Sequence, residues 1–516
     1  MAGDSMLRTI SDHYEFTVAL ADEQATGRLV IDVAALIEPG DFITLSGDLG
    51  AGKTTFARAL IRHLAHDETI EVPSPSFTLM QVYELPGITI VHGDLYRVSA
   101  TSEVSELGFD DVPERALVLL EWPHRAGALL PRDRLDIALT LSPEHGLTFR
   151  NARVTGFGSM AARAERIAVL RRFLDEAGFG NADRRRIQGD ASTRSYERLT
   201  RGEDTFILMN APRRPDGPPI RDGKPYSAIA HLAEDVTPFI AIAGALRERG
   251  LSAPAVLHAD RDNGILILED LGNVPVVEGN PPEPIKERYA TAVDVLAKLH
   301  SETLPTVLAV APDVDYRLPP YDMDALLIEL ELLADWYLPL LGASILPAAR
   351  EGYLLLWRNA LRPAVAGEQT WVLRDFHSPN LIWLPDRRGV ARIGLIDFQD
   401  ALIGHPAYDL ASLLQDARVD VPETTEIALL SRYTRARLAA NEHFDTPGFV
   451  RVYSTLAAQR ASKILGIFAR LDRRDGKPQY LRHLPRVRRY LHRALSHPAL
   501  AALNAWYAAN VPALRS

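Results

Sequence analysis

Hydrophobic residues in the first 150 positions fall into short runs separated by polar stretches. The runs at 41–45, 88–91, 117–120 and 135–139 have the length of buried strands, and residues 55–61 have the spacing of a helix. Buried strands that alternate with helical stretches over about 150 residues are typical of an α/β domain. The pattern therefore predicts that the chain begins with such a domain.

The pattern changes after residue 156. Residues 156–162 are small and flexible, and a helix is predicted from about 165 to 176. The chain is then rich in strand-like runs, with one predicted helix near 227–249, before it becomes helical to its C-terminus. A chain of 516 residues also exceeds what one ordinary core supports. The predicted boundaries are 1–157 for the first domain, 160–516 for the second, and about 180–272 and 273–516 for its small and large lobes.

A phosphate-binding pattern, G-x-x-x-x-G-K-[ST], lies between the first predicted strand and the first predicted helix. Glycines let backbone N–H groups wrap the phosphates, the lysine reaches the β and γ oxygens, and the hydroxyl serves Mg²⁺. The strand-loop-helix order is the one that this chemistry requires. The segment predicts a site for ATP or GTP. The predicted nucleotide contacts are Gly47, Asp48, Leu49, Gly50, Ala51, Gly52, Lys53, Thr54 and Thr55.

Two carboxylates follow strand-like runs in the same domain. Asp94 comes three residues after the end of the run at 88–91, and Glu121 closes the run at 117–120. Phosphate-loop enzymes need a carboxylate at a strand end to hold Mg²⁺ or to polarise the attacking water. We expect Asp94 and Glu121, with Thr54, to serve the metal and hydrolysis.

Charge and composition narrow the classes of function. Residues 1–150 carry 11 Lys and Arg against 23 Asp and Glu, so this segment is a poor candidate for gripping nucleic acid directly. Any role with RNA would then run through a protein partner. The chain has no cysteine, which excludes disulfides, thiolate metal sites and cysteine nucleophiles. It also has no apolar run near the ~20 residues of a membrane span, so we expect a cytoplasmic protein without membrane contact.

A second constellation lies in the C-terminal half. Asp375 precedes Asn380 by five residues, and Asp397 ends an apolar run that begins at residue 393. Kinases place one Asp near the acceptor hydroxyl and hold Mg²⁺ with an Asn and a second Asp. The spacing favours a kinase site, with a polar turn as the alternative for the first two residues alone.

The motifs of the first half resemble the TsaE-type ATPase subunit of the bacterial machinery that makes threonylcarbamoyladenosine at position 37 of tRNA. The motifs are 47–54, Ser-Pro-Ser-Phe-Thr-Leu at 74–79, 92–97 and Glu-Trp-Pro at 121–123. The resemblance implies that Lys53 and Thr54 bind phosphate and Mg²⁺ and that Trp122 lies near the nucleotide. Ser76 stands where the family more often has threonine. The resemblance also implies docking onto protein subunits of that machinery.

The second half resembles the aminoglycoside phosphotransferase and choline kinase superfamily, on residues 372–382, 393–400 and 404–411. Residues 190–198 and 331–338 are similar to AmgK-type kinases, which phosphorylate the anomeric hydroxyl of N-acetylmuramate and N-acetylglucosamine in cell-wall recycling. Both halves are expected to use ATP and Mg²⁺. The implied roles are catalytic base for Asp375, Mg²⁺ ligands for Asn380 and Asp397, phosphate cover for Ser192, Thr193 and Arg194, and adenine hinge for Glu269 to Leu271.

The expected fold is therefore an α/β P-loop NTPase domain followed by a bilobal, protein-kinase-like α+β domain. Two departures from the kinase pattern matter: the strand at 206–212 lacks a lysine, and Leu373 stands where the superfamily usually has histidine. Arg194 is a candidate for the missing cation. A pseudokinase scaffold and a kinase for another alcohol, such as an aminoglycoside or choline, remain alternatives. His92 and His377 are either structural or functional.

Overall fold

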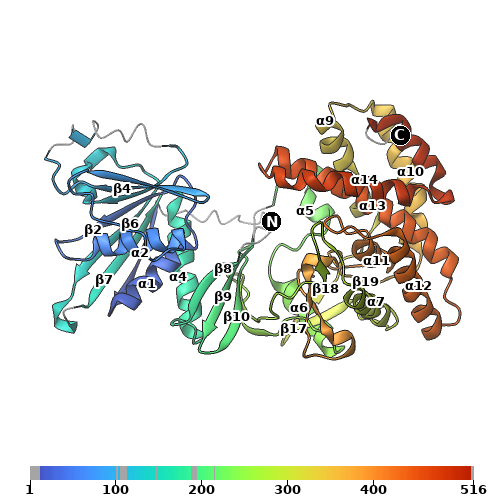
Figure 1. The fold of residues 1–516 in the computed structure, drawn as a ribbon, viewed down its shortest axis with the longest axis horizontal. Coiled ribbons are helices and arrows are strands. Elements are labelled where there is room, and N and C mark those ends of the chain that lie inside the picture. The colour runs from blue at the N-terminus through green and yellow to red at the C-terminus, as the bar shows by residue number, and fades with distance from the viewer. Residues whose placement is uncertain are drawn as a thin grey trace, which may run out of the picture. The chain divides into compact units, whose positions relative to one another are not determined.

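The structure of the chain is a computed structural model that describes residues 12–99, 103–104, 113–146, 148–187, 194–213 and 216–512. It separates into two compact units (Figure 1). The first comprises residues 1–188 with 197–204, and the second comprises 189–196 with 205–516. The domain boundary expected between 157 and 160 stays a prediction.

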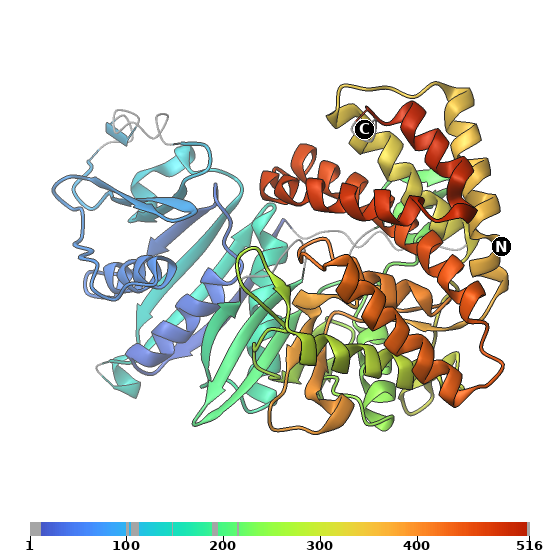
Figure 2. The ribbon, with the colours of Figure 1, turned by 45° about the vertical axis from the view of Figure 1, so that its right-hand side comes forward.

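A seven-stranded mixed sheet forms the centre of the first unit, with strand order β1-β7-β6-β2-β5-β4-β3 (Figure 2, blue to cyan). The neighbours β6, β2, β5 and β4 run parallel, whereas β1, β7 and β3 pair antiparallel at the edges. The expected α/β fold is thus confirmed. The strands are β1 His13–Leu20, β2 Phe42–Ser46, β3 Met80–Leu85, β4 Ile88–Asp94, β5 Leu117–Glu121, β6 Arg134–Leu141 and β7 Arg150–Phe157.

Helices α1 (Glu23–Ala34), α2 (Lys53–Ala65) and α4 (Met160–Glu176) share one apolar core with this sheet. Strand β5 is buried along its whole length, as a central parallel strand covered on both faces must be. The Asp22 side chain caps α1 by accepting a hydrogen bond from the Ala25 backbone N–H at 2.7 Å. Helix α4 contributes Met160 and Ile167 to the core, so it packs with the first unit.

A five-stranded sheet follows in the chain, with order β13-β14-β10-β9-β8. Its strands are β8 Asp183–Ile187, β9 Ser195–Arg201, β10 Asp204–Asn210, β13 Val256–Asp260 and β14 Ile265–Glu269. The single helix expected near 227–249 is wrong. It is divided into α5 (Tyr226–Ile229) and α6 (Thr237–Glu248), with His231 between them at a positive φ of 52° that a helix does not allow.

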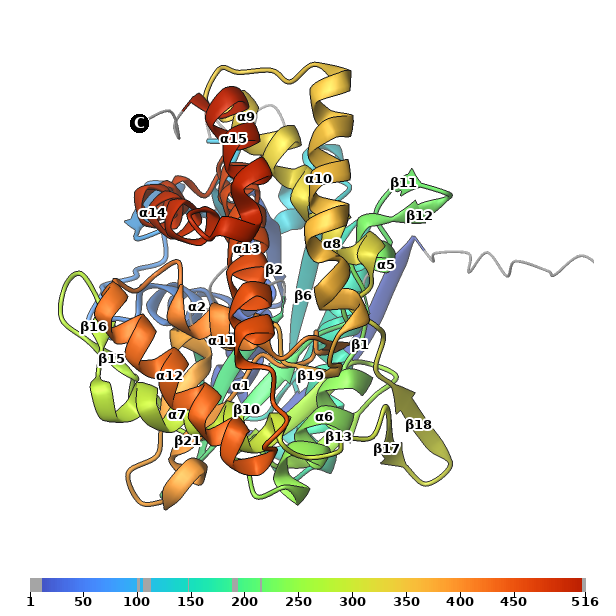
Figure 3. The ribbon, with the colours of Figure 1, turned by 90° about the vertical axis from the view of Figure 1, so that its right-hand side faces the viewer.

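The chain after this sheet is mainly helical, as expected, and the bilobal kinase-like fold is confirmed (Figure 3). Its helices are α7 Lys286–His300, α8 Met323–Leu332, α9 Leu338–Leu340, α10 Pro347–Ala366, α11 Ala407–Leu414, α12 Glu423–Ala440, α13 Thr446–Arg473, α14 Leu484–Leu495 and α15 Ala501–Asn510. Short strand pairs connect them: β11 Pro219–Arg221 with β12 Lys224–Pro225, β15 Val277–Glu278 with β16 Glu283–Pro284, β17 Val307–Ala311 with β18 Val314–Arg317, β19 Thr370–Val372 with β22 Leu402–Gly404, and β20 Leu381–Trp383 with β21 Ile393–Leu395.

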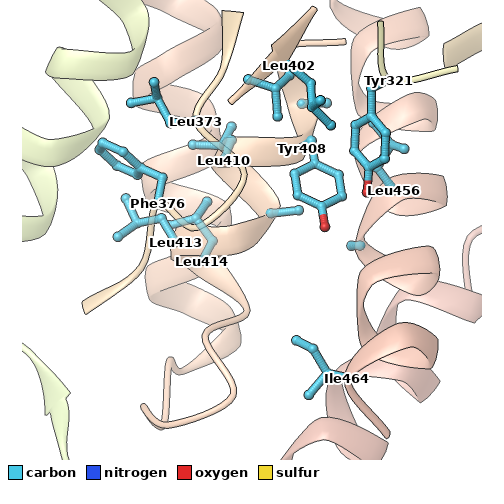
Figure 4. Packing of buried hydrophobic residues seen from close by; sticks show 14 of the residues in the cluster. Tyr321, Leu373, Phe376, Leu402, Tyr408, Leu410, Leu413, Leu414, Leu456 and Ile464 are labelled. Atoms are coloured by element: carbon cyan, nitrogen blue, oxygen red, sulfur yellow. The ribbon is translucent and has the colours of Figure 1, made fainter. Parts of the chain in front are cut away.

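The large core of this unit extends beneath the segment that carries Asp375. Leu373 and Phe376 point into an apolar cluster with Leu410 and Leu413 of α11 (Figure 4). These side chains anchor the segment in the core. Over the described residues, no helix combines the length and the apolar character needed to cross a bilayer.

Candidate functional site

The phosphate loop joins β2 to α2 and is built around Lys53. The Lys53 Nζ donates hydrogen bonds to the backbone oxygens of Gly47 and Asp48, each at 2.9 Å. It also lies 3.7 Å from the ring centroid of Trp122, which places a cation over the indole face. Burial lowers the pKa of the Lys53 ammonium, although the carboxylates nearby oppose this shift. The lysine is thus held inside the loop that phosphates would enter.

Gly47 is required by the geometry of this loop. Its φ of 137° lies in a region that side chains rarely adopt, and a Cβ would collide with the backbone oxygen of Leu139. Gly52 likewise has a positive φ, at 107°, where it precedes α2. The two glycines let the backbone turn tightly enough for its N–H groups to face a ligand at the helix N-terminus.

The carboxylates Asp94 and Glu121 lie side by side because β4 and β5 are parallel neighbours and these two residues are register partners. Glu121 accepts a hydrogen bond from the Thr54 hydroxyl at 3.0 Å, and Asp94 accepts one from the Ser74 hydroxyl at 2.6 Å. The predicted carboxylates and hydroxyl therefore meet at one sheet edge. Carboxylate and hydroxyl oxygens are ligands that suit Mg²⁺, which is bound by one or two carboxylates together with substrate phosphates.

Buried His92 is paired with Glu121, at 3.0 Å between its Nε2 and the Glu121 Oε1. Its Nδ1 has no hydrogen-bond partner among the described residues. With Thr54 on one carboxylate oxygen and His92 on the other, the orientation of Glu121 is fixed from both sides. The geometry therefore favours a positioning role for His92 over a merely packed side chain.

A cavity of about 390 Å³ lies over this loop and includes groups that the sequence did not indicate. Arg150 from β7 reaches it and donates from Nε to the backbone oxygen of Ala51 at 2.8 Å. Tyr96 and Arg97, which belong to the motif at 92–97, also line it, and the Tyr96 and Trp122 rings lie 5.1 Å apart. Its other lining residues are Leu49, Gly50, Gly52, Lys53, Thr54, Thr55, Ser74, Ser76, Asp94 and Glu121.

The second site lies on the segment between β19 and β20. The Asn380 Nδ2 donates to the backbone oxygen of Asp375 at 2.9 Å and to the Asp397 carboxylate at 3.3 Å. Gln399 donates a hydrogen bond to the other Asp397 oxygen at 2.8 Å. The three residues singled out from spacing alone thus converge, with Asp397 at a positive φ of 59°. Such strained backbone persists where the surroundings hold it in place.

Asp409 of α11 anchors this segment. Its carboxylate accepts hydrogen bonds from the backbone N–H groups of Leu373 and Arg374, at 2.6 and 2.9 Å. Burial raises the Asp409 pKa to about 7 in spite of these bonds. Ser378 is held in a similar way, because its backbone N–H and its hydroxyl both donate hydrogen bonds to the Asp416 carboxylate, at 2.9 and 2.6 Å. Asp375 is therefore flanked by two anchored positions.

Leu373, in the position usual for histidine, is buried at 2% exposure in the cluster of Figure 4. Its backbone rather than its side chain positions the segment. The missing strand lysine has a candidate substitute in Arg194, whose Nη1 lies 3.6 Å from the Asp397 carboxylate. Ser192 and Thr193 lie outside the described residues. Glu269 forms ion pairs with Arg247 and Arg387, and the adenine role of Glu269 and Leu271 stays a prediction.

A buried cation beneath Asp375 was missed from the sequence. Lys463 of α13 lies 2.7 Å from Glu329 of α8, which also pairs with Arg374. Burial alone would raise the Asp375 pKa, but His377 when protonated, and then Lys463 and Arg374, lower it overall. Burial lowers the His377 pKa to about 4, so His377 is neutral near pH 7. Lys463 and Arg374, which stay protonated near pH 7, favour the ionised form of Asp375, the form that can accept a proton.

Comparison with known proteins assigns both halves. The sequence profile of threonylcarbamoyl adenosine biosynthesis protein TsaE matches residues 20–148, and that of the phosphotransferase enzyme family matches residues 183–453. The N-acetylmuramate/N-acetylglucosamine kinase of Caulobacter vibrioides is 41% identical over 366 residues, which cover 68% of this chain and 99% of that protein. The kinase of the same name from Pseudomonas aeruginosa is 35% identical over 324 residues, covering 61% of this chain and 84% of that protein.

The first half has relatives of its own. The tRNA threonylcarbamoyladenosine biosynthesis protein TsaE of Rickettsia felis is 37% identical over 126 residues, covering 24% of this chain and 73% of that protein. The two matches do not overlap, so both families are present in one chain. The chain therefore belongs to the phosphotransferase enzyme family through its C-terminal part and to the TsaE family through its N-terminal part, and it is an ATP-using enzyme that joins the two.

Proposed function

We propose that the C-terminal half transfers the γ-phosphoryl group of ATP to the anomeric hydroxyl of N-acetylmuramate and N-acetylglucosamine. The observation that carries this proposal is the convergence of Asp375, Asn380 and Asp397, together with the likeness to kinases named for these two sugars. Asp375 accepts the proton of the attacking hydroxyl. Asn380 and Asp397 would hold Mg²⁺, which when bound neutralises charge on the phosphates, and Arg194 adds a cation at the same place.

The pseudokinase alternative loses its basis in the structure of the segment. Leu373 contributes packing and a backbone N–H, and neither function needs a histidine. Arg194 supplies positive charge where the strand lysine is absent. With the base and both proposed metal ligands present, catalysis is the function that this geometry supports.

The test is mass-spectrometric detection of sugar phosphate after the full chain is incubated with MgATP and each sugar. Asp375→Asn removes the base without changing its shape and should abolish the product. Asp386→Asn is the matched control, because Asp386 is an exposed carboxylate on a nearby turn. Phosphorylation that persists undiminished in Asp375→Asn would contradict the proposed base, and phosphorylation of choline or an aminoglycoside instead would replace the acceptor.

We infer that the N-terminal half hydrolyses ATP in support of tRNA N6-threonylcarbamoyladenosine formation. Lys53 and the phosphate loop would bind the nucleotide, Thr54 and Asp94 would serve Mg²⁺, and Glu121 would orient the attacking water. Trp122 would stack beside the nucleotide, where Lys53 now contacts it. Retention of ATPase activity by Lys53→Ala would contradict this assignment.

We propose that its partners are protein subunits of that machinery rather than tRNA itself, and that it acts in the cytoplasm. The acidic charge of residues 1–150 supports this choice, because phosphate backbones need a basic surface. Co-purification of tagged full chain with those subunits in the absence of tRNA is the expected result. Binding that requires tRNA would contradict it.

A further inference from the structure

A second cavity of about 750 Å³ lies within the second unit, beside the segment between β19 and β20 that carries Asp375, here called the kinase segment. Ser378 and Pro379, next to Asn380, form one wall, and Ile396, which precedes Asp397, belongs to the same cavity. Residues 272–275, 277 and 280–282 form a wall beyond the predicted hinge, and residues 418–419, 479–480, 482–483 and 486 close it. Its volume falls within the range of roughly 300–1,000 Å³ typical of ligand pockets.

The charged residues that line this cavity are all basic. Arg418, Arg482 and Arg486 line it together with His483, and no Asp or Glu is among its described lining residues. Burial and then these three arginines lower the His483 pKa to about 4, so the histidine itself is neutral near pH 7. The cavity therefore presents an excess of positive charge next to the reaction centre.

The three arginines are not equivalent. Arg486 is fixed by Asp420, with hydrogen bonds of 2.8 and 2.7 Å to its two carboxylate oxygens, so its charge is largely matched. Exposed Arg482 donates from Nε to His483 at 3.3 Å and makes no ion pair within the described part of the chain. Its planar guanidinium retains donors for a carboxylate, which arginine can bind through two parallel hydrogen bonds.

The acceptor pair offers a reason for such a subsite. N-acetylmuramate carries a lactyl carboxylate on the oxygen of C3, whereas the hydroxyl that reacts is on C1. One molecule thus needs two places: a carboxylate base for the hydroxyl and a cationic pocket for the acid. N-acetylglucosamine has a neutral hydroxyl on C3 and needs only the first. Cationic acceptors such as choline or aminoglycosides would instead meet like charge in this pocket.

We propose that this cavity receives the carboxylate of N-acetylmuramate and that Arg482 binds it, with Arg418 adding to the positive charge. The inference rests on the proposed function of the C-terminal half and deepens it. It assigns selectivity between the two sugars to a place apart from Asp375, which is not among the residues that line the cavity. Loss of the pocket's charge should then affect one sugar and spare the other.

The experiment measures kcat and KM of the full chain for both sugars at saturating MgATP, in wild type, Arg482→Gln and Arg482→Lys. Arg482→Gln should raise KM for N-acetylmuramate about tenfold, as expected for loss of a hydrogen-bonded ion pair, and leave KM for N-acetylglucosamine unchanged. Arg482→Lys keeps the charge but lacks the parallel donors of the guanidinium, so its KM for N-acetylmuramate should lie between those of wild type and Arg482→Gln. Arg435→Gln is the matched control, since it removes an exposed arginine of α12 outside the cavity.

Three results would overturn the inference while the proposed function stands. The first is an unchanged KM for N-acetylmuramate, and the second is an equal rise for both sugars. The third is a rise of KM for ATP, measured with N-acetylglucosamine, which would assign the arginine to a nucleotide phosphate. Activity on N-acetylglucosamine reports that the variant is folded. A wild-type chain that phosphorylates neither sugar would refute the proposed function and, with it, this inference.

Discussion

Asp409→Asn tests how the kinase segment is positioned. The carboxylate of Asp409 accepts two backbone N–H groups, those of Leu373 and Arg374, directly before Asp375. Asparagine has the same shape but only one acceptor oxygen, so its NH₂ would face one of the two N–H donors. A buried N–H left without a partner costs about 1–3 kcal/mol. If that cost displaces the base, kcat should fall roughly 5- to 150-fold.

Overall stability should respond differently from kcat. Burial raises the Asp409 pKa from 3.8 to about 7, so the charged form in the folded protein costs on the order of 4 kcal/mol. A raised pKa means that the stability contributed by the protonated group is fully present below pH 3.8 and is lost as pH rises through about 7. At pH 8 the neutral asparagine avoids this cost, which offsets the lost hydrogen bond. The thermal midpoint of the variant should therefore fall little, and less at pH 8 than at pH 5.

The assay is steady-state sugar phosphorylation by the full chain at pH 8, with thermal unfolding followed at pH 5 and pH 8. ATP hydrolysis without sugar reports on the separate phosphate-loop site and should not change. Asp386→Asn controls for the loss of a carboxylate at an exposed position. A kcat within twofold of wild type would refute the argument that Asp409 positions the base, and a midpoint that falls more at pH 8 than at pH 5 would refute the sign of the linkage.

Three further outcomes are expected. Lys53→Ala should abolish sugar-independent ATP hydrolysis and leave sugar phosphorylation intact, because the lysine belongs to the phosphate loop alone; joint loss of both activities would contradict independent sites. His92→Gln should lower that hydrolysis by about tenfold with little effect on ATP affinity, since it loosens Glu121 and not the loop; a changed affinity measured by fluorescence titration would argue against positioning. Lys463→Met should cost about 3–5 kcal/mol of stability in the second unit, measured by urea unfolding, because Glu329 loses a partner while buried. Burial raises the Glu329 pKa, but Lys463 and Arg374 bring it down to about 2. The stability that ionised Glu329 contributes in the wild type is therefore present above pH 4.5 and is lost as pH falls toward 2. The variant should lose part of this pH dependence.

The sequence allowed prediction of those features that chemistry imposes locally. The phosphate loop must have its glycines, lysine and hydroxyl at fixed spacing, and Asp375 must precede Asn380 by five residues in a loop of this kind. The common role expected for Asp94 and Glu121 followed from their positions after strand-like runs, which proved to be parallel neighbours. Each of these signals lies within a few residues of one element.

Groups that arrive from distant elements gave no such signal. Arg150 comes to the phosphate loop from β7, and Lys463 of α13 pairs with Glu329 and brings positive charge near Asp375. Neither lies in a motif, because only tertiary packing brings it to its site. The break between α5 and α6 was also missed, since the positive φ of His231 depends on its surroundings and not on a glycine or proline at that position.

Helix α4 has a practical consequence for anyone who wishes to separate the two activities. The two family matches leave residues 149–182 unassigned, yet α4 buries Met160, Ala164 and Ile167 in the core of the ATPase sheet. A truncation at residue 157 would strip these side chains away and expose an apolar strip along β1 and β7, which invites aggregation. A division after α4, where Gly178 follows the helix, would let the ATPase keep these side chains.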